Sequence, residues 1–350
     1  MVVINQFPGY KFIPSGEDRH PHNTYRGEDV GFGGYVYAEP GTYTNVTLLD
    51  VASMHPTTIE ILNLFGSYTE KFSVLKEARM AIKHKDYKTA RTLLGGKLEP
   101  YLKDDNDAEA LSYALKIVIN TVYGLTSAKF STPFRDTRNV NNIVALRGAL
   151  FMIDLKHAVQ EKGFVVAHIK TDSIKIPDAT PEIIDFVMEF GKKYGYNFEN
   201  EGVFDWFCLV NDAVYIAKSG DKWNAVGAQF QHPYVLKTLF THEPIEFEDY
   251  CEAKNVLKGR IYLDFSETGE VDKMVHVGRT NSFVPVEDGG VLWRVNEDNK
   301  YAVTGTKGYL WIDRETAFDR LNNGTLNIDM RYFEELKQKA SEAINKFKEQ

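Results

Sequence analysis

The sequence predicts an α+β fold in which an antiparallel sheet is interrupted by a helical insertion. Residues 45–54 (NVTLLDVASM) and 165–177 (VVAHIKTDSIKIP) are rich in β-branched and apolar residues, which is typical of strands. The polar turn KTDS makes the second stretch a hairpin. Between them, 68–102 and 107–124 have helical patterns, with capping candidates in DDND before the second block and Gly124 at its end. We therefore expect one sheet with helices inserted into it.

The remaining elements follow in order. Helices are expected over about 140–160 and 181–194, followed by strands through CLVNDAVYIAK. After residue 230 the composition is mixed, with short strand candidates such as GRIYLDF. A final amphipathic helix is expected with one apolar stripe made of Phe333, Leu336, Ala340, Ile344 and Phe347. The C-terminal third is thus predicted to be a separate mixed region.

Composition limits the classes of function. The 350 residues are 43% hydrophobic and 26% charged, which is typical of a globular protein. A net charge of −8 argues mildly against nucleic acid as a partner, although local basic groups matter more than the total. The sequence contains no apolar run of about 18 residues, the length that a membrane-spanning helix needs, so no membrane partner is expected. The two cysteines fit a reducing cytoplasm, that of the host cell if the protein is viral.

Two acids have the same setting in the predicted sheet. Asp50 and Asp172 each stand where a hydrophobic strand gives way to polar residues. Pairing of those strands would bring the two carboxylates close together, which suits Mg²⁺ ions that are also bound by substrate phosphates. Two such ions, roughly 3.5–4 Å apart, activate an attacking oxygen and stabilise a leaving one. Two unrelated acids at strand ends remain the alternative.

Two sets of polar side chains recur at helical spacing. Lys116, Asn120 and Tyr123 are at i, i+4 and i+7, on one face of the second helical block. Arg79 and Lys83 are at i and i+4, and such a pair of cations suits a polyphosphate. Taken alone, each set is better explained by an ordinary helix face, solvated or half-buried for the first set and solvated for the second.

Together, three segments resemble the signatures of family B DNA polymerases. Residues 50–59 (DVASMHPTTI) resemble the first polymerase motif of that family, 116–124 (KIVINTVYG) its fingers motif, and 170–173 (KTDS) its Asp-Thr-Asp-Ser hairpin. They occur in the family's order, and each falls on the expected type of element. The resemblance is closest to compact phage-type members and covers roughly residues 30–235.

The resemblance implies a right-hand polymerase core, with an antiparallel-sheet palm, helical fingers inserted into it and a mixed thumb. The expected parts are an N-terminal segment leading into the palm (1–44), the first part of the palm (45–66), the fingers (67–130), the second part of the palm (131–232) and the thumb (233–350).

The resemblance also implies roles for individual residues. Asp50 and Asp172 would be catalytic and would hold two Mg²⁺ ions with the carbonyl of Val51, and Mn²⁺ would be able to substitute. The nucleotide-binding residues would be Ser53, His55, Arg79, Lys83, Lys116, Asn120 and Tyr123. The DNA-binding residues would be Gly124, Lys170, Thr171, Tyr215 and Lys237.

The function implied is template-directed DNA synthesis, in which a primer is extended with dNTPs. Primer–template DNA and dNTPs would be the partners. Only 49 residues precede Asp50, which is too few for a 3′–5′ exonuclease domain, so we expect the chain to lack that activity. A separate exonuclease or a replication accessory protein is therefore a further candidate partner.

Three departures from the family pattern leave other functions open. Lys170 stands where the family has the first acid of its hairpin, His55 where it has a tyrosine, and Ala213 where it has a lysine. These changes would suit a catalytically weak or silent polymerase-like subunit that binds DNA. A metal-dependent nuclease or phosphatase also pairs carboxylates, but it leaves Lys116, Asn120 and Tyr123 unexplained.

Overall fold

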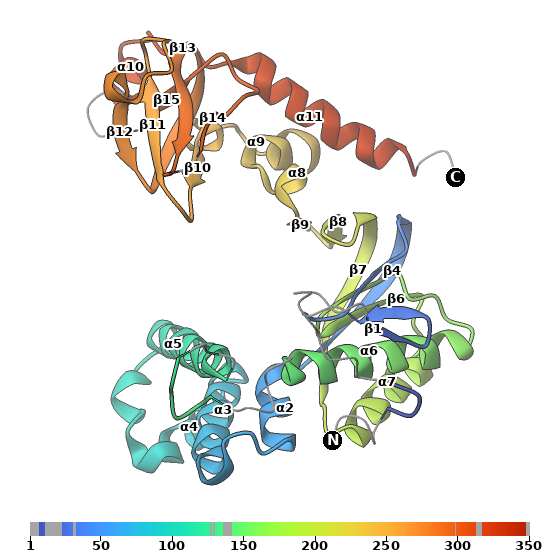
Figure 1. Cartoon of the computed structure of the whole chain (residues 1–350). Coiled ribbons are helices and arrows are strands. Elements are labelled where there is room, and N and C mark those ends of the chain that lie inside the picture. Colours follow the sequence, from blue (N-terminus) through green and yellow to red (C-terminus); the bar gives the residue numbers. More distant parts are fainter. Residues whose placement is uncertain are drawn as a thin grey trace. The chain divides into compact units, whose positions relative to one another are not determined.

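The protein divides into two compact units, Met1–Asp212 and Ala213–Gln350. The computed structural model describes residues 7–10, 23–30, 33–126, 128, 130–135, 142–297, 299–312 and 317–347. Helices and antiparallel sheets occur in both units, so the predicted α+β class is confirmed (Figure 1). Among the described residues, no helix is both long enough and apolar enough to cross a bilayer.

The first unit is built on an antiparallel sheet in the order β3-β5-β6-β4-β7, beside a small β1–β2 hairpin. Its strands are β1 (Asn23–Tyr25), β2 (Glu28–Val30), β3 (Val36–Ala38), β4 (Gly41–Val51), β5 (His168–Lys170), β6 (Ser173–Pro177) and β7 (Phe198–Asn211). Its helices are α2 (Met54–Ile61), α3 (Thr69–Lys83), α4 (Tyr87–Thr92), α5 (Asp105–Leu125), α6 (Ile143–Glu161) and α7 (Pro181–Lys193). The hairpin predicted over 165–177 is β5 and β6.

The strand predicted over 45–54 begins and ends earlier than expected. It is β4, which starts at Gly41 because Thr42 and Tyr43 already pair with β7. It stops at Val51 because Ser53 adopts a left-handed conformation, with φ of 57°, and Met54 then begins α2. This sharp change of direction places the residues after Asp50 at the end of the sheet, which is where a site can form.

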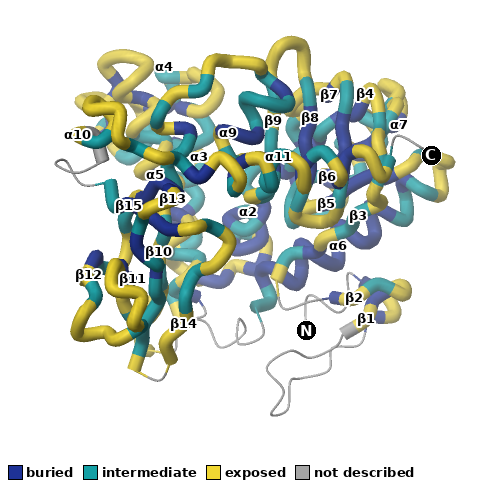
Figure 2. Tube along the Cα trace, turned by 90° about the horizontal axis from the view of Figure 1, so that it is seen from above, coloured by how far each residue is buried: buried dark blue, intermediate teal, exposed yellow. Residues whose placement is uncertain are grey.

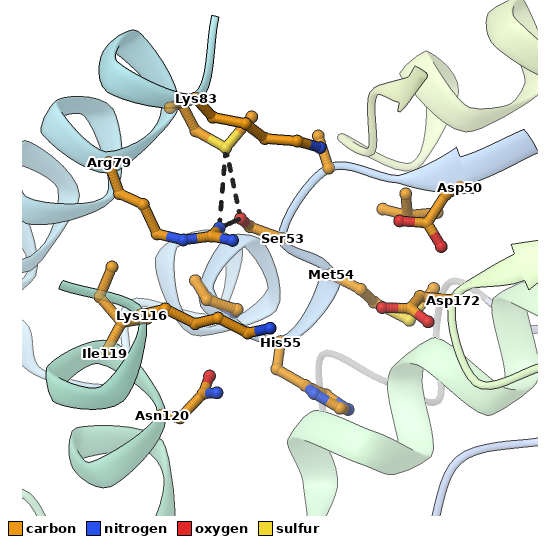
Figure 3. Close-up of a pocket in the computed structure, with 14 residues that line it drawn as sticks. Asp50, Ser53, Met54, His55, Arg79, Lys83, Lys116, Ile119, Asn120 and Asp172 are labelled. Atoms are coloured by element: carbon orange, nitrogen blue, oxygen red, sulfur yellow. Dashed lines mark hydrogen bonds between the residues drawn. The ribbon is translucent and has the colours of Figure 1, made fainter. Parts of the chain in front are cut away.

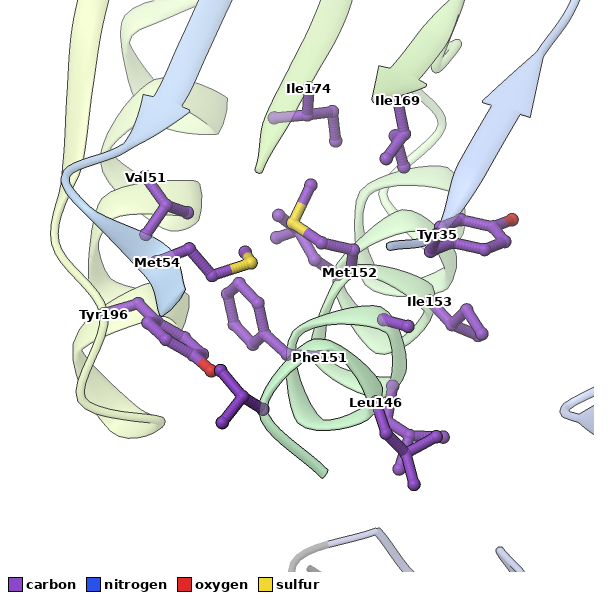
Figure 4. Close-up of a cluster of buried hydrophobic side chains, with 14 of the residues drawn as sticks. Tyr35, Val51, Met54, Leu146, Phe151, Met152, Ile153, Ile169, Ile174 and Tyr196 are labelled. Atoms are coloured by element: carbon purple, nitrogen blue, oxygen red, sulfur yellow. The ribbon is translucent and has the colours of Figure 1, made fainter. Parts of the chain in front are cut away.

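A buried helix and a hydrophobic sheet face make the core of this unit. Helix α6 is buried along most of its length (Figure 2). Met152, which is 0% exposed, reaches toward Ile174 of the hairpin, while Phe151, also 0% exposed, packs against Tyr196 with ring centroids 4.7 Å apart (Figure 4). Each such side chain contributes roughly 1.5–3 kcal/mol by its burial. The core therefore fixes the hairpin that carries Asp172.

Close packing of α2 on α6 fixes the segment after β4. A Cβ atom at Gly148 of α6 would lie 2.6 Å from the sulfur of Met54, so the two helices approach more closely than a larger residue would allow. Met54 is 2% exposed. Its neighbours Ser53 and His55 are therefore held by a packed helix rather than by a free loop.

The insertion between α2 and α6 has a small hydrophobic core of its own. Ala78 and Ile82 of α3 and Leu115 of α5 are buried in it. Helix α5 begins at the predicted cap, where the side chain of Asp104 accepts a hydrogen bond from the backbone N–H of Asp107 (2.9 Å). It continues one residue beyond the predicted end at Gly124. Arg79, Lys83 and Lys116 thus project from two helices packed against each other.

The second unit contains a larger share of strands. Its strands are β8 (Val214–Ser219), β9 (Lys222–Val226), β10 (Glu252–Asn255), β11 (Arg260–Asp264), β12 (Val275–Gly278), β13 (Thr280–Val295), β14 (Lys300–Ala302) and β15 (Tyr309–Trp311). Strand β13 pairs with β10, β11, β14 and β15, and β11 also pairs with β12. Its helices are α8 (Ala228–Gln231), α9 (Pro233–Leu236), α10 (Ala317–Asn322) and α11 (Met330–Asn345).

The predicted stripe of the last helix is largely present. Phe333, Ala340 and Ile344 of α11 are buried, and Leu336 is half-buried. Phe347 lies two residues beyond the end of the helix at Asn345, so it does not belong to the helical stripe.

Candidate active site

Residues from four separate segments of the first unit line one cavity of about 290 Å³. They come from the end of β4 and the start of α2, from α3, from α5 and from the β5–β6 turn (Figure 3). The lining residues are Asp50, Val51, Ala52, Ser53, Met54, His55, Pro56, Arg79, Met80, Lys83, Lys116, Ile119, Asn120 and Asp172. Nine of these fourteen residues are among those predicted from the sequence to bind the metal ions or the nucleotide.

The two acids are placed side by side by the register of the sheet. Asp50 on β4 is the Cα partner of Ser173 on β6, so Asp172 lies next to it. The backbone N–H of Val51 donates to the carbonyl of Asp172 (2.9 Å), which ties the two acid-bearing segments together. The hairpin turn is tight, since the N–H of Asp172 donates to the carbonyl of Lys170 (2.7 Å).

Thr171 is the residue that makes this turn possible. Its φ is 59°, an uncommon value for a β-branched residue, and its N–H donates to the carbonyl of Tyr35 (2.9 Å). Its side chain occupies the space over Gly34, where a Cβ atom would lie 2.6 Å from the Thr171 methyl carbon. Thr171 is therefore held as a backbone support for Asp172.

Burial and mutual repulsion favour the protonated forms of the two acids. Burial, followed by the charges of Asp172 and Glu201, raises the pKa of Asp50 to about 7. Burial also raises the pKa of Asp172. When two neighbouring carboxylates are both ionised, a cation between them stabilises their charged forms. Mg²⁺ needs only one or two protein carboxylates, because substrate phosphates supply further ligands. The pair therefore fits a divalent metal, although no group of three His, Cys, Asp or Glu among the described residues is placed to hold one.

The wall opposite the acids is cationic. Figure 3 shows the charged ends of Arg79, Lys83 and Lys116 reaching into the cavity from the helices, while Asp50 and Asp172 lie across from them. Arg79 donates to the hydroxyl of Ser53 (3.2 Å), and its Nε is buried without a hydrogen-bond partner in the described part of the chain.

Lys83 and Lys116 differ in how they are engaged. The ammonium of Lys83 lies 2.6 Å from Glu199 and 3.2 Å from Glu201. Burial acts to lower the pKa of Lys83, but these two bonds outweigh it, and the pKa is raised. Lys116 is exposed and forms no ion pair with any residue that the structure describes. One cation is thus already engaged, and the other is available to a ligand.

A stacked pair of rings lies beside the cavity. The rings of His55 and Tyr123 are parallel within 2°, with centroids 4.8 Å apart. The hydroxyl of Tyr123 donates to the side-chain oxygen of Asn142 (3.1 Å), which fixes the tyrosine ring. Burial lowers the pKa of His55, so the imidazole is neutral near pH 7. The pair presents a flat, uncharged surface next to Asn120.

Other predicted residues lie outside the cavity. Gly124 is exposed on α5, and a Cβ atom there would meet nothing within 4 Å. Lys170 is exposed at the end of β5. Tyr215 and Lys237 belong to the second unit: Tyr215 is 8% exposed, and Lys237 is paired with Asp249 at 2.8 Å.

Sequence reasoning missed three charged residues near the acids. Lys175 of β6 is 3% exposed, and burial lowers its pKa to about 8, while its charge acts on both aspartates. Glu199 and Glu201 of β7 are the partners of Lys83. The pattern SIKIP, with a lysine between two isoleucines of a strand, was an available signal for Lys175, since a charge in a buried strand needs a partner. No local signal marked the two glutamates.

Paired carboxylates facing several cations are the arrangement that proteins use for phosphorylated substrates and metal ions. Among solved structures, the chain is similar to a family B DNA polymerase from the hyperthermophilic archaeon Pyrobaculum calidifontis, with a TM-score of 0.49 and 14% sequence identity. The match covers 96% of this chain and 48% of that one, so this chain spans about half the length of the polymerase. No protein-family model and no curated protein match the sequence.

Proposed function

We propose that the protein is a template-directed DNA polymerase that extends a primer with dNTPs by two-metal nucleotidyl transfer. The motifs at 50–59, 116–124 and 170–173 suggested this reaction from sequence. The observation that carries the proposal is their convergence. Residues from all three motifs, and the cations of α3, line a single cavity with acids on one wall and cations on the other.

In the proposed reaction, the carboxylates of Asp50 and Asp172 and the carbonyl of Val51 would hold the metal ions. When bound, two Mg²⁺ ions supply activation of the primer 3′-hydroxyl and neutralisation of the leaving pyrophosphate. The protein contributes position, because the hydrogen bond between Val51 and Asp172 keeps the two acid-bearing segments in register before any ligand arrives.

The cationic wall binds the triphosphate of the incoming nucleotide. Lys116 has no ion-pair partner among the described residues and can donate to phosphate oxygens. Arg79 bonds to Ser53, and its Nε–H has no hydrogen-bond partner in that part of the chain. Lys83 is a third phosphate ligand, but it must first leave Glu199 and Glu201. Fixed cations that face developing negative charge lower the barrier to phosphoryl transfer.

The stacked rings bind the base and sugar. Tyr123 and Asn120 lie against the nascent base pair, and His55 lies under the sugar, where a ribose 2′-hydroxyl would collide with it. Ser53 holds Arg79 in position beside the nucleotide. Gly124, Lys170 and Thr171 contact the primer–template duplex, and Tyr215 and Lys237 contribute DNA contacts from the second unit.

Primer extension by the purified protein tests the proposal. A labelled primer annealed to a longer template should be extended when Mg²⁺ and dNTPs are present, and not when EDTA replaces Mg²⁺. Hydrolysis of the DNA without any need for nucleotides would instead indicate a nuclease.

A second candidate function is a polymerase-like subunit that binds DNA without catalysis. Its support is Lys170, a cation at the place where the related motif has an acid, together with His55 and Ala213, which replace a tyrosine and a lysine of the related motifs. Binding of primer–template DNA without extension in either Mg²⁺ or Mn²⁺ would favour this function over the polymerase.

A further inference from the structure

We propose that Glu199 and Glu201 are positioning residues that hold Lys83 away from the triphosphate until a nucleotide binds, and that they thereby set the affinity for the nucleotide. This inference rests on the proposed function and goes beyond it, because it assigns a role to two acids that are not among the residues lining the cavity.

The ammonium of Lys83 is bound by two carboxylates in the free protein. Lys83 is the last residue of α3, and its ammonium bridges the two carboxylates, at 2.6 Å from Glu199 and 3.2 Å from Glu201. His84 adds a third contact, with Nε2 2.8 Å from the second oxygen of Glu199. These side-chain contacts attach the C-terminal end of α3 to β7.

The shape of β7 brings both glutamates to the lysine. Glu199 is the Cα partner of Asp50, so it lies next to the candidate metal ligands. The register between β4 and β7 then shifts, because Leu49 pairs with Asn200 but Leu48 pairs with Gly202. Glu201 is the extra residue at this bulge. Bulges commonly redirect a side chain near an active site, and here Glu201 reaches the same ammonium as Glu199.

A bound nucleotide competes with the two glutamates for Lys83. Lys83 lines the same cavity as Arg79 and Lys116. Its side chain is 39% exposed, so its ion pairs with the glutamates are weak enough to exchange. A triphosphate that takes the ammonium leaves Glu199 with His84, which still occupies the other carboxylate oxygen. The ion pairs of Lys83 with Glu199 and Glu201 can therefore break when a nucleotide binds and re-form when pyrophosphate leaves.

The consequence is measurable in nucleotide affinity. Lys83 must break its ion pairs with Glu199 and Glu201 before it can bind phosphate. The free energy that this requires reduces the net binding free energy from the Lys83–phosphate contact. Neutralising the glutamates removes that competition, so we expect Glu199→Gln and Glu201→Gln together to tighten dNTP binding about three- to fivefold. The KM for the nucleotide should fall by the same factor.

The test uses the full chain bound to a primer–template whose primer ends in a dideoxynucleotide, so that nucleotide binding occurs without reaction. The dissociation constant of the matching dNTP is measured in Mg²⁺ for the wild type, for the double glutamine variant, and for both in a Lys83→Met background. The control is Glu189→Gln, since Glu189 is an exposed acid of α7 with a lysine partner, Lys192, at 2.7 Å.

Tighter binding that disappears in the Lys83→Met background, with no change for the control, supports the proposal. Tighter binding that persists without Lys83 would show a general effect of charge and overturn it, as would unchanged or weaker binding. If Lys116→Met weakens nucleotide binding while the glutamine variants do nothing, only this inference fails. If the wild type binds no nucleotide, the proposed function fails and this inference fails with it.

Discussion

Replacing Lys116 with methionine tests the cationic wall most cleanly. Lys116 lines the cavity, is exposed and has no ion-pair partner among the described residues, so the substitution breaks no ion pair there, although it removes a charge that acts on Asp172. A hydrogen bond to a charged group contributes about 1.5–3 kcal/mol. Loss of one such bond to the triphosphate should lower kcat/KM for the nucleotide about 10- to 150-fold. Lys83→Met should lower kcat/KM by a smaller factor, because Lys83 already bonds to Glu199 and Glu201 in the free protein.

The assay is insertion of a single nucleotide on a primed template over a range of dNTP concentrations, with DNA affinity measured separately. Lys103→Met removes an exposed lysine shortly before α5 and serves as the control. The reasoning is refuted if Lys116→Met behaves like Lys103→Met, or if it weakens DNA binding while the nucleotide requirement stays the same.

Three further predictions concern pH, sugar choice and the core. In the folded protein the pKa of Asp50 is about 7 against an ordinary 3.8, so without metal the free energy of unfolding should fall as pH rises from about 4 to 7. Urea unfolding in EDTA should show this decline, and Asp50→Asn should reduce it; an unchanged slope would contradict the assignment. His55→Ala removes the ring stacked on Tyr123 and should raise incorporation of ribonucleotides roughly tenfold in direct competition with dNTPs, whereas unchanged selectivity would remove His55 from the sugar site. Phe151→Ala should cost about 3–5 kcal/mol in urea unfolding, because the ring is fully buried against Tyr194 and Tyr196, and a loss below about 1 kcal/mol would show that the core is described wrongly.

Much of the fold is readable from local patterns. The hairpin over 165–177 is predictable because its strands are apolar and its turn is polar. Asp104 marks the start of α5 because an aspartate satisfies free N–H groups there. The end of β4 was not predictable, since the left-handed conformation of Ser53 depends on how α2 packs against α6. Local sequence does not encode such tertiary constraints.

The candidate site, too, was predictable only in its local features. Helical spacing grouped Lys116 with Asn120 and Arg79 with Lys83, and strand ends marked Asp50. Those groupings were local, whereas their convergence on one cavity is a property of the fold. The contacts of Lys83 with Glu199 and Glu201 join residues more than a hundred positions apart through a bulge in β7, and no pattern within either segment indicates them.

Asp50 and Asp172 are proposed to form a metal-dependent centre for nucleotidyl transfer. The most direct measurement compares primer extension and primer–template binding for the wild type, Asp172→Asn and Asp185→Asn, the last being an exposed acid of α7. Extension should be lost in Asp172→Asn and kept in Asp185→Asn, while all three proteins bind DNA with similar affinity. Extension by Asp172→Asn at the wild-type rate would contradict the account.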